Sequence, residues 1–557
     1  MSVLSCPSIV RFSLEDLELF SVASHDRNAI HLSPEYARKT FYGQEVVFGI
    51  LGALACAGSI ALPSNCTISN ISLEFKNPMF VGIDYDIIAV QISPQVISVR
   101  LCDGSKTLVK ANFTFADRES AALSWKNPQQ SVRLIPADAD EKELRDGATI
   151  KGQYRPTPTA FSELMRRFGI DERRFGSLQL AALLWSSYLV GMEQPGQRGL
   201  FCKLELAFED ISLCQQACLC YDARVASLNA LNMLRSELRL AWGDQLVARG
   251  EAWSILIPNS PRGSLSTVAA LLPPSDRLKG KVALVIGASR GLGAMLTTAL
   301  ALQGCTVLAN FNRSDQEARQ LLETLTGTPG KVILLKGDAA DVSWCEELQA
   351  RVTQEYGRLD FLICNACPPL LPLQVEAKTI TRINSYVSQA MALVSVPMAV
   401  FLKVLEEEFG WSVVISSLSV DTLPKEWPHY VAVKCAVEAL ARVAALQYPK
   451  ANFLLVRPPR LRTDLTNTPW PHRDSILPEL AAAKIVERLQ SPPAGQVEVF
   501  SIHGSGTVSA TGVAAALSSN DGITSQVCRE VSQRDCIGER ARKSQSSSEA
   551  VEEIEIL

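Results

Sequence analysis

The sequence is poor in histidine and has no marked excess of either charge. Five of its 557 residues are histidine, and none lies between His31 and His429. Lysine and arginine number 54 against 58 aspartate and glutamate residues, which gives a formal net charge of −4. A chain with balanced charges offers no excess of basic residues for binding nucleic acids. The few histidines do not occur at the spacings of metal ligands. We therefore expect neither a nucleic-acid partner nor a bound metal.

We expect neither a membrane span nor a secretory leader. Residues 46–62 carry no charge, but they contain glycines and end at Pro63, short of the roughly 20 residues that a spanning helix needs. They favour a buried core helix. The N-terminus has no basic segment followed by an apolar one, as a signal peptide would. The 15 cysteines are scattered, which favours free thiols over a disulfide framework. We predict a cytoplasmic protein with no membrane span.

Length and local composition divide the chain into five parts. Residues 1–122 and 123–262 each show a long apolar helix pattern followed by runs of alternating apolar and polar residues. This repeated order predicts two units of antiparallel sheet around a helix. Residues 263–278 follow the turn Pro258-Asn-Ser-Pro261 and include the turn Leu272-Pro-Pro-Ser-Asp276, and this composition predicts a linker. Residues 279–505 alternate strand and helix patterns, which predicts an α/β doubly wound parallel sheet. Residues 506–557 have too little apolar content to pack a core and predict a disordered tail.

Residues 281–293, KVALVIGASRGLG, form a strand pattern, a glycine turn and the start of a helix pattern. Glycines in such a turn let the backbone approach a diphosphate. The helix N-terminus then offers free N–H groups and the positive end of its dipole. This stretch predicts a nucleotide site.

Three further motifs stand downstream of the glycine turn. They are Asp338-Ala339, Asn365-Ala366, and Tyr430-Val-Ala-Val-Lys434 with Ser417 thirteen residues before the tyrosine. Together the four motifs resemble the short-chain dehydrogenase/reductase family, in particular its 3-oxoacyl-thioester reductases. The resemblance implies a Rossmann-type fold in which the phenol of Tyr430 donates a proton to a carbonyl oxygen as hydride reaches the carbon. Lys434 would lower the pKa of that phenol, and Ser417 would hold the substrate oxygen.

The same resemblance implies the rest of the reductase site. Gln389 stands where the family has the asparagine of its proton relay. The cofactor contacts would come from Gly287, Ser289, Arg290, Gly291, Leu292, Gly293, Asn312, Arg313, Asp338, Ala339, Asn365, Ala366, Tyr430, Lys434 and Thr463. The sequence departs from the family at Ile286, Cys367, Pro459 and Gln389. These departures leave open a fold that serves as a scaffold without turnover.

The cofactor preference follows from charge at the end of the second strand of this region. Members of the family that prefer NAD place an acid there, whereas this chain has Asn312-Arg313, and Arg290 lies in the glycine turn. Two guanidinium groups without an acid suit a 2′-phosphate. We predict NADP(H).

A second motif lies near the N-terminus. Asp26-Arg-Asn28-Ala-Ile-His31, followed by Phe41-Tyr-Gly and Val47-Phe-Gly49, resembles the MaoC-type, (R)-specific enoyl-thioester hydratases of the hot-dog fold. The resemblance implies that Asp26 and His31 hold and deprotonate the water that adds to an enoyl thioester. The N–H of Gly49 would bind the thioester oxygen. Because residues 123–262 lack this motif, we expect a hot-dog pair in which the second unit is non-catalytic.

The two resemblances together predict a bifunctional enzyme of fatty-acid or polyketide metabolism. It would reduce a 3-oxoacyl thioester and dehydrate the 3-hydroxyacyl product to the enoyl thioester. The acyl group would be carried by coenzyme A or by an acyl carrier protein, and we expect a homo-oligomer. Two alternatives stay open: a reductase whose hot-dog pair is an acyl-binding or thioesterase module, and a non-catalytic scaffold in a multienzyme assembly.

Overall fold

The structure is a computed structural model. It describes residues 2–3, 8–60, 66–117, 123, 125–127, 132–140, 142–210, 216–259, 262–468 and 475–502. The tail predicted at residues 506–557 lies outside these ranges.

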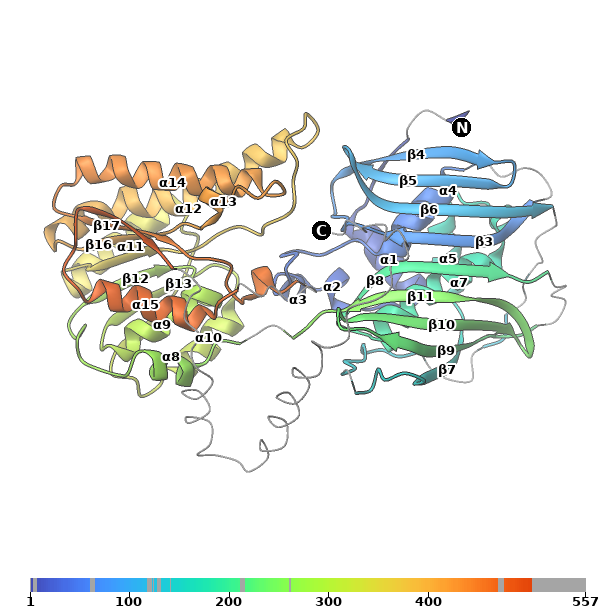
Figure 1. Cartoon of the computed structure of the whole chain (residues 1–557), viewed down its shortest axis with the longest axis horizontal. Helices are drawn as coiled ribbons and strands as arrows, with labels where there is room; N and C mark the ends of the chain where they lie inside the picture. The colour runs from blue at the N-terminus through green and yellow to red at the C-terminus, as the bar shows by residue number, and fades with distance from the viewer. Residues whose placement is uncertain are drawn as a thin grey trace, which may run out of the picture.

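An antiparallel sheet dominates the N-terminal half, and helices pack on one of its faces (Figure 1). Each half of this sheet follows a buried apolar helix, α4 (Gly49–Gly58) or α7 (Ser177–Tyr188). The strands after α4 are β3 (Cys66–Phe75), β4 (Asp84–Ser93), β5 (Val96–Asp103) and β6 (Lys106–Asp117). Those after α7 are β8 (Gly199–Phe208), β9 (Leu219–Leu228), β10 (Met233–Trp242) and β11 (Gln245–Leu256). All eight were predicted from the alternating patterns.

The two sets of strands mirror each other about the centre of the sheet. The order is β4-β5-β6-β3 on one side and β8-β11-β10-β9 on the other, and β3 pairs antiparallel with β8. This pairing fuses the two predicted units into one continuous sheet. The repeated order of elements predicted from the sequence therefore corresponds to a repeated strand order.

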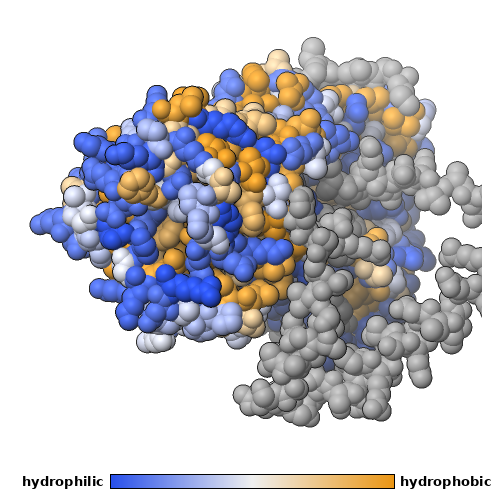
Figure 2. Space-filling model, turned by 60° about the vertical axis from the view of Figure 1, so that its left-hand side comes forward, coloured by the Kyte–Doolittle hydropathy of each residue, from blue (hydrophilic) through white to orange (hydrophobic). Residues whose placement is uncertain are grey.

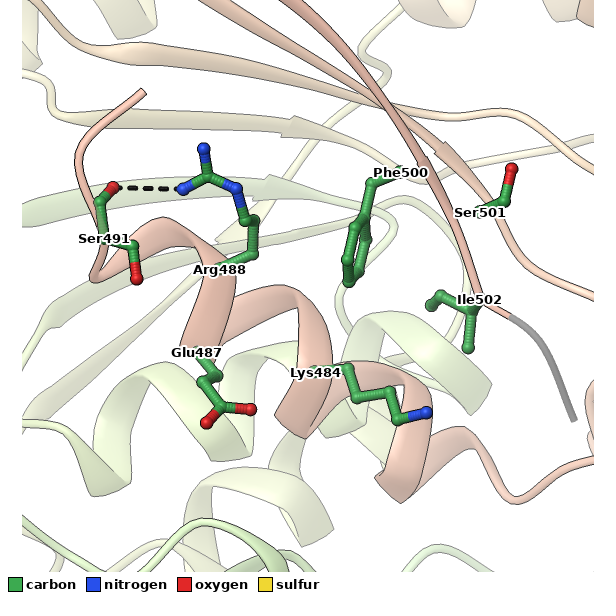
Figure 3. Close-up of a pocket in the computed structure, with 7 residues that line it drawn as sticks. All are labelled: Lys484, Glu487, Arg488, Ser491, Phe500, Ser501 and Ile502. Carbon is green, nitrogen blue, oxygen red and sulfur yellow. Dashed lines mark hydrogen bonds between the residues drawn. The ribbon is translucent and has the colours of Figure 1, made fainter. Parts of the chain in front are cut away.

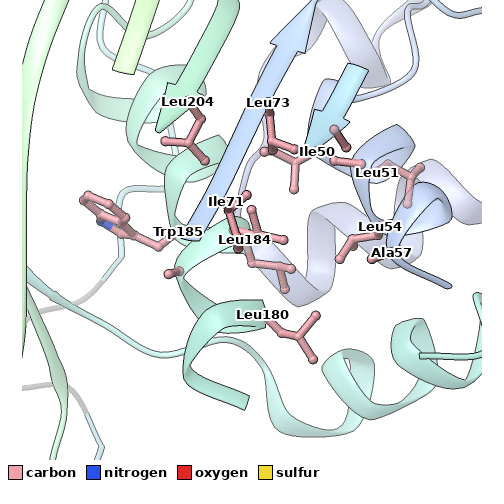
Figure 4. Close-up of a cluster of buried hydrophobic side chains, with 14 of the residues drawn as sticks. Ile50, Leu51, Leu54, Ala57, Ile71, Leu73, Leu180, Leu184, Trp185 and Leu204 are labelled. Atoms are coloured by element: carbon pink, nitrogen blue, oxygen red, sulfur yellow. The ribbon is translucent and has the colours of Figure 1, made fainter. Parts of the chain in front are cut away.

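The core of this half lies between the sheet and the two apolar helices. Figure 4 shows side chains of α4 and α7 against Ile71 and Leu73 of β3 and Leu204 of β8. Leu54 of α4 and Leu184 and Trp185 of α7 are fully buried. Helices that are buried on all sides need such complete enclosure, so α4, which falls within the uncharged run predicted as a core helix, is one here.

Several shorter elements were not predicted. They are β1 (Ser2–Val3), β2 (Ser8–Arg11), β7 (Thr149–Tyr154), α1 (Leu14–Ser24), α2 (Ala29–Leu32), α5 (Pro158–Arg167), α6 (Glu172–Phe175) and α8 (Leu265–Leu271). Strands β1, β2 and β7 lie at the ends of the sheet. A strand there pairs with only one neighbour, and its apolar pattern is weak. Helix α8 falls inside the predicted linker; it buries Val268 and packs on the C-terminal region.

A parallel sheet forms the centre of the C-terminal region, in the order β14-β13-β12-β15-β16-β17-β18. Its strands are β12 (Val282–Ile286), β13 (Thr306–Phe311), β14 (Lys331–Lys336), β15 (Phe361–Cys364), β16 (Trp411–Ile415), β17 (Asn452–Arg457) and β18 (Val497–Ser501). The helices are α9 (Gly291–Leu302), α10 (Asp315–Thr324), α11 (Val342–Tyr356), α12 (Ile380–Glu407), α13 (Ser419–Thr422), α14 (Pro428–Gln447) and α15 (Pro478–Leu489). Because the order reverses beside β12, the carboxyl ends of β12 and β15 border the ligand crevice of such a sheet.

One of these helices is long and apolar enough to cross a membrane, by length and composition alone. It is α12, which packs between α11 and α14 and contacts β15 and β16. Its apolar character therefore has a use as a cover of the parallel sheet.

The burial of α7 gives a test of this fold. We expect Leu184→Ala to lower the free energy of unfolding of the N-terminal half by about 2–5 kcal/mol, because it opens a cavity in a closed core. Leu231, which is 50% exposed, provides the control, and Leu231→Ala should change stability by less than about 0.5 kcal/mol. Urea unfolding followed by tryptophan fluorescence would measure both. Equal effects would contradict the packing described for α7.

Candidate active sites

The glycine turn lies between β12 and α9, at the edge where the parallel strands end. Gly287 and Gly291 have φ angles of 76° and 52°, which glycine adopts without strain. A Cβ on Gly293 would lie 2.0 Å from the carbonyl oxygen of Gly287. The start of the helix lies so close to the turn that position 293 has no room for a side chain. The side-chain amide of Asn365 donates to the same oxygen at 3.0 Å. The turn is thus held by the end of β15.

Ser417, Tyr430 and Lys434 come together at the ends of β16 and α14. The Nζ of Lys434 donates to the carbonyl of Ile415 at 2.7 Å and lies 5.4 Å from the centre of the Tyr430 ring. Burial raises the pKa of Tyr430 above its ordinary value, while a hydrogen bond with Ser417 lowers it. Burial also lowers the pKa of Lys434. The phenol therefore keeps its proton at neutral pH. The resemblance implied a lowered pKa for this phenol, and burial shifts it in the opposite direction.

Gln389 is not brought into this group. Its side chain is exposed, and its amide donates to Ser385 Oγ at 3.1 Å, one turn back on α12. The residue of α12 that faces the site is Tyr386, whose hydroxyl lies 3.3 Å from Cys367 Sγ. The Tyr386 ring packs edge-on against His429, with ring centres 4.4 Å apart. Counting along a motif gave the position of Gln389, but helix rotation decides which side chain points inward.

The other predicted cofactor residues border the crevice. Ser289 and Ala366 are half-buried, Leu292 and Ala339 are buried, and Asn312, Arg313 and Asp338 are exposed just after β13 and β14. The side chain of Thr463 would lie 3.3 Å from a Cβ on Gly291, so it borders the glycine turn from the opposite side. These positions fit a dinucleotide: glycines and a helix N-terminus for the diphosphate, and Asn312 and Arg313 where the adenosine ribose would lie.

Asp26 lies in the core of the N-terminal half. It is 2% exposed, and burial raises its pKa to about 7. Its carboxylate accepts from Ser187 Oγ at 2.7 Å and from the N–H of Asn28 at 3.0 Å. A Cβ on Gly191 would lie 2.4 Å from the carboxylate. Ser187 and Gly191 belong to α7 and to the π-helix that continues it (Leu189–Glu193). The second unit therefore builds one wall of the Asp26 site, which the sequence did not indicate.

His31 lies on α2, four residues before Glu35, with its ring stacked on Phe48 at a centre-to-centre distance of 3.9 Å. Its Nδ1 lies 2.6 Å from the carbonyl oxygen of Val46. Burial lowers its pKa to about 4, so the ring is neutral at pH 7, with Nδ1 protonated toward Val46. Nε2 then keeps its lone pair and can act as a base.

Two neighbouring residues complete the surroundings of this site. Gly49 is the first residue of α4, where backbone N–H groups have no partner within the helix. A Cβ there would lie 2.9 Å from the ring of Phe75. Asn28 orders the loop between Asp26 and His31, because its amide donates to the carbonyls of Gly191 and Gly196, both at 3.2 Å. An N–H donor, a neutral imidazole and a carboxyl group of raised pKa are the components of acid–base chemistry on a carbonyl compound.

A separate pocket of about 540 Å³ lies between α15 and β18 (Figure 3). Its lining contains Lys484, Arg488 and Phe500 and none of the predicted site residues. The guanidinium of Arg488 is already paired with Glu498, and it also donates to the carbonyl of Ser491. This pocket offers no group of unusual chemistry.

Comparison with known proteins identifies the C-terminal region. Residues 281–474 match the family described as short chain dehydrogenase. Versicolorin reductase 1 of Dothistroma septosporum is 34% identical over 90 residues, 16% of this chain and 34% of that protein. The hydroxynaphthalene reductase-like protein Arp2 of Metarhizium acridum is 26% identical over 243 residues, 41% of this chain and 89% of that protein. An alcohol dehydrogenase structure from Thermococcus sibiricus, complexed with 5-hydroxy-NADP, is 23% identical with a TM-score of 0.37, and the match covers 40% of this chain and 97% of that one.

These matches have a limited extent. An uncharacterised oxidoreductase of Methylorubrum extorquens is 37% identical over 91 residues, 16% of this chain and 37% of that protein. The chain thus spans about a third of the length of the first relatives that it matches. The resemblance predicted for residues 279–505 is confirmed at the level of the family. The family match does not reach residues 1–280, so the hot-dog pair stays a prediction.

The buried carboxyl of Asp26 predicts a pH-dependent stability difference. Since its pKa is about 7 in the folded protein and 3.8 ordinarily, the folded state binds more protons than the unfolded state between these values. Folding stability is therefore lost as the pH rises through this window. Asp26→Asn removes the ionisation. The free energy of unfolding of this variant, relative to that of wild type, should therefore rise by a few kcal/mol between pH 4 and pH 8. Each unit of pKa shift corresponds to about 1.4 kcal/mol.

Urea unfolding at pH 4.5 and pH 8 would measure this difference. Glu163→Gln is the control, because Glu163 is exposed on α5, and its stability difference should stay flat across the same range. A flat difference for Asp26→Asn would contradict the raised pKa.

Proposed function

We propose that this chain, whose C-terminal region is a short-chain dehydrogenase/reductase, reduces a 3-oxoacyl thioester with NADPH and dehydrates the product to the enoyl thioester. The observation that carries the proposal is the presence of two sets of acid–base groups in one chain, around Tyr430 and around Asp26, with a shared boundary between them.

In the reductase site, NADPH when bound would supply the hydride. Tyr430 donates its phenolic proton to the oxygen of the 3-oxo group. The hydroxyl of Ser417 donates a hydrogen bond to the same oxygen, which also positions the carbonyl carbon. The ammonium group of Lys434 stabilises the phenolate left after the transfer. The hydrogen bond to Ile415 holds that ammonium group in place while it does so.

In the N-terminal site we propose that residues 1–262 form the hot-dog pair. The mirrored strand orders around α4 and α7 support it. Dehydration removes a proton from the carbon next to the thioester and releases the 3-hydroxyl as water. Nε2 of His31 is a neutral base for the first step, and the carboxyl of Asp26, with a pKa of about 7, can protonate the leaving hydroxyl. The N–H of Gly49 would bind the enolate oxygen.

The loop that leaves β15 supports successive steps on one intermediate. Cys367 lies beside Tyr386 in the reductase site. A Cβ on Gly43 would lie 2.4 Å from Pro369, and Leu371 packs in a cluster with Ile30 and Val46. Ile30 precedes His31, and the carbonyl oxygen of Val46 is the hydrogen-bond partner of the His31 ring. Four residues, which span at most about 14 Å, thus lead from one site to the neighbourhood of the other.

The relatives support the reductase part of the proposal. The names versicolorin reductase and hydroxynaphthalene reductase-like protein point to carbonyl reduction in polyketide-related metabolism. We therefore favour a polyketide or fatty-acid β-carbon, carried by coenzyme A or an acyl carrier protein. NADP(H) is the proposed cofactor, because Arg290 and Arg313 border the crevice.

We further propose a cytoplasmic homo-oligomer. Buried free thiols such as Cys56, Cys345 and Cys364 suit a reducing compartment. On α14, Val443 and Leu446 are 52% and 81% exposed, and hydrophobic groups reach the surface of this region at several places (Figure 2). Exposed hydrophobic side chains of this size suit contact with a second copy.

Two single substitutions would separate the two activities. With acetoacetyl thioesters of both carriers, we expect Tyr430→Phe to slow NADPH oxidation by about 10²–10⁴ because the proton donor is lost. Asp26→Asn should leave NADPH oxidation unchanged and abolish the rise in enoyl absorbance. Both signals would be followed in the same cuvette.

The alternatives predict other results. Wild-type protein that oxidises NADPH but forms no enoyl product, even from added 3-hydroxybutyryl thioester, would favour an acyl-binding or thioesterase module in the N-terminal half. Tight binding of NADPH without turnover on any 3-oxoacyl thioester would favour a scaffold.

The cofactor assignment has its own test. We expect kcat/KM to be at least about tenfold higher with NADPH than with NADH, because a guanidinium–phosphate hydrogen bond is charge-assisted. Steady-state rates at a fixed thioester concentration would measure the ratio. A ratio below one would contradict the assignment.

A further inference from the structure

Two basic residues of the N-terminal half reach the cofactor end of the parallel sheet. Arg38 and Lys39 follow α3 (Pro34–Ala37). Both side chains pair with Glu317 on α10, Arg38 Nη2 at 3.1 Å and Lys39 Nζ at 2.6 Å. Arg38 also donates from Nη1 to the backbone carbonyl of Arg313. Arg313 lies in the segment after β13 where the adenosine ribose would be held.

Arg38 also contacts the glycine turn. Its carbonyl oxygen accepts from Arg290 Nη1 at 2.8 Å, and the same nitrogen of Arg290 lies 3.5 Å from Asp464 Oδ2. The only arginine of the turn is therefore positioned by a backbone group of the other half of the chain. One residue, Arg38, bridges both segments that the sequence assigned to the 2′-phosphate.

Charge at this junction is unbalanced. Arg38, Lys39 and Arg290 pair with Glu317 and Asp464 here, and Asp315 at the start of α10 is matched by Lys336. The exposed side chains of Arg313 and Asp338 follow the neighbouring strands β13 and β14. Four cationic side chains against three carboxylates leave one positive charge, which favours binding of a phosphate monoester of about −2. The side chain of Arg38 is only 18% exposed, and its Nε is buried without a hydrogen-bond partner among the described residues. The junction thus holds an unused donor and a surplus of charge.

We propose that Arg38 of the N-terminal half completes the 2′-phosphate pocket of the C-terminal region. Its guanidinium provides a hydrogen-bond donor to the phosphate, and its carbonyl positions Arg290 for a second one. Binding of the phosphorylated cofactor and docking of the two halves then stabilise each other, because the ligand favours the arrangement in which Arg38 is present. The proposal rests on the NADP(H) assignment above.

The test compares two arginines at the same boundary. Arg382 on α12 pairs with both carboxylate oxygens of Asp103, at 2.8 and 2.6 Å. It therefore joins the halves through α12 and β5. Titration calorimetry on the full chain would give Kd values for NADPH, NADH, 2′,5′-ADP and ADP, for wild type, Arg38→Ala, Arg38→Lys and Arg382→Ala. The two adenosine ligands report on the phosphate without any contribution from the nicotinamide or from turnover.

We expect Arg38→Ala to raise the Kd values of NADPH and 2′,5′-ADP by about tenfold or more, which is the usual effect of losing a charge-assisted contact. NADH and ADP should change less than about twofold. Arg38→Lys, which keeps the charge but loses the planar fork, should lie between, and it replaces the alanine variant if that variant does not fold. Arg382→Ala should leave the NADPH/NADH ratio of Kd values unchanged.

Two outcomes would overturn the inference in different ways. If Arg38→Ala weakens all four ligands equally, or weakens none, Arg38 is only part of the boundary, while the cofactor assignment stands. If wild type does not distinguish 2′,5′-ADP from ADP, the NADP(H) assignment fails, and the inference fails with it.

Discussion

The pairing of β3 with β8 is the contact on which the N-terminal half depends. It makes one sheet from two and places α4 and α7 on the same face, where their side chains share a single core. Nearly every side chain of both helices is buried, so each needs the enclosure that the joined sheet provides. At the end of α7, Ser187 and Gly191 lie against Asp26. Burial raises the pKa of the Asp26 carboxyl group, while the hydrogen bond from Ser187 lowers it.

The boundary between the two halves includes segments that adjoin both candidate sites. On one side, the loop after β15 packs Leu371 against residues that adjoin His31. On the other side, Arg38 reaches Arg290 and the segment after β13. Between them, ion pairs such as Arg382 with Asp103 join α12 to the antiparallel sheet.

Most regular elements could be predicted from the sequence because their signal is local. The strands from β3 to β6 and from β8 to β11 alternate with a period of two, and β12 to β18 are short apolar runs between helices. The elements that escaped prediction have little local signal. Strand β7 is an edge strand of mixed composition. Helix α8 lies between proline-containing turns and has only one fully buried residue, Val268, so its apolar pattern is weak. Tertiary contact, rather than propensity, makes these segments regular.

The sequence by itself determined which chemical groups this protein has: a glycine turn, a tyrosine with a lysine one helical turn on, a serine upstream, and an Asp–His motif near the N-terminus. Spacing along one strand or helix carries that information. Only the tertiary structure decided which groups meet. It turned Gln389 outward and Tyr386 inward, brought Ser187 to Asp26 from 161 residues away, and set Arg38 beside Arg290 across 252 residues. Such contacts depend on helix rotation and on the docking of distant segments, and neither leaves a pattern in neighbouring residues.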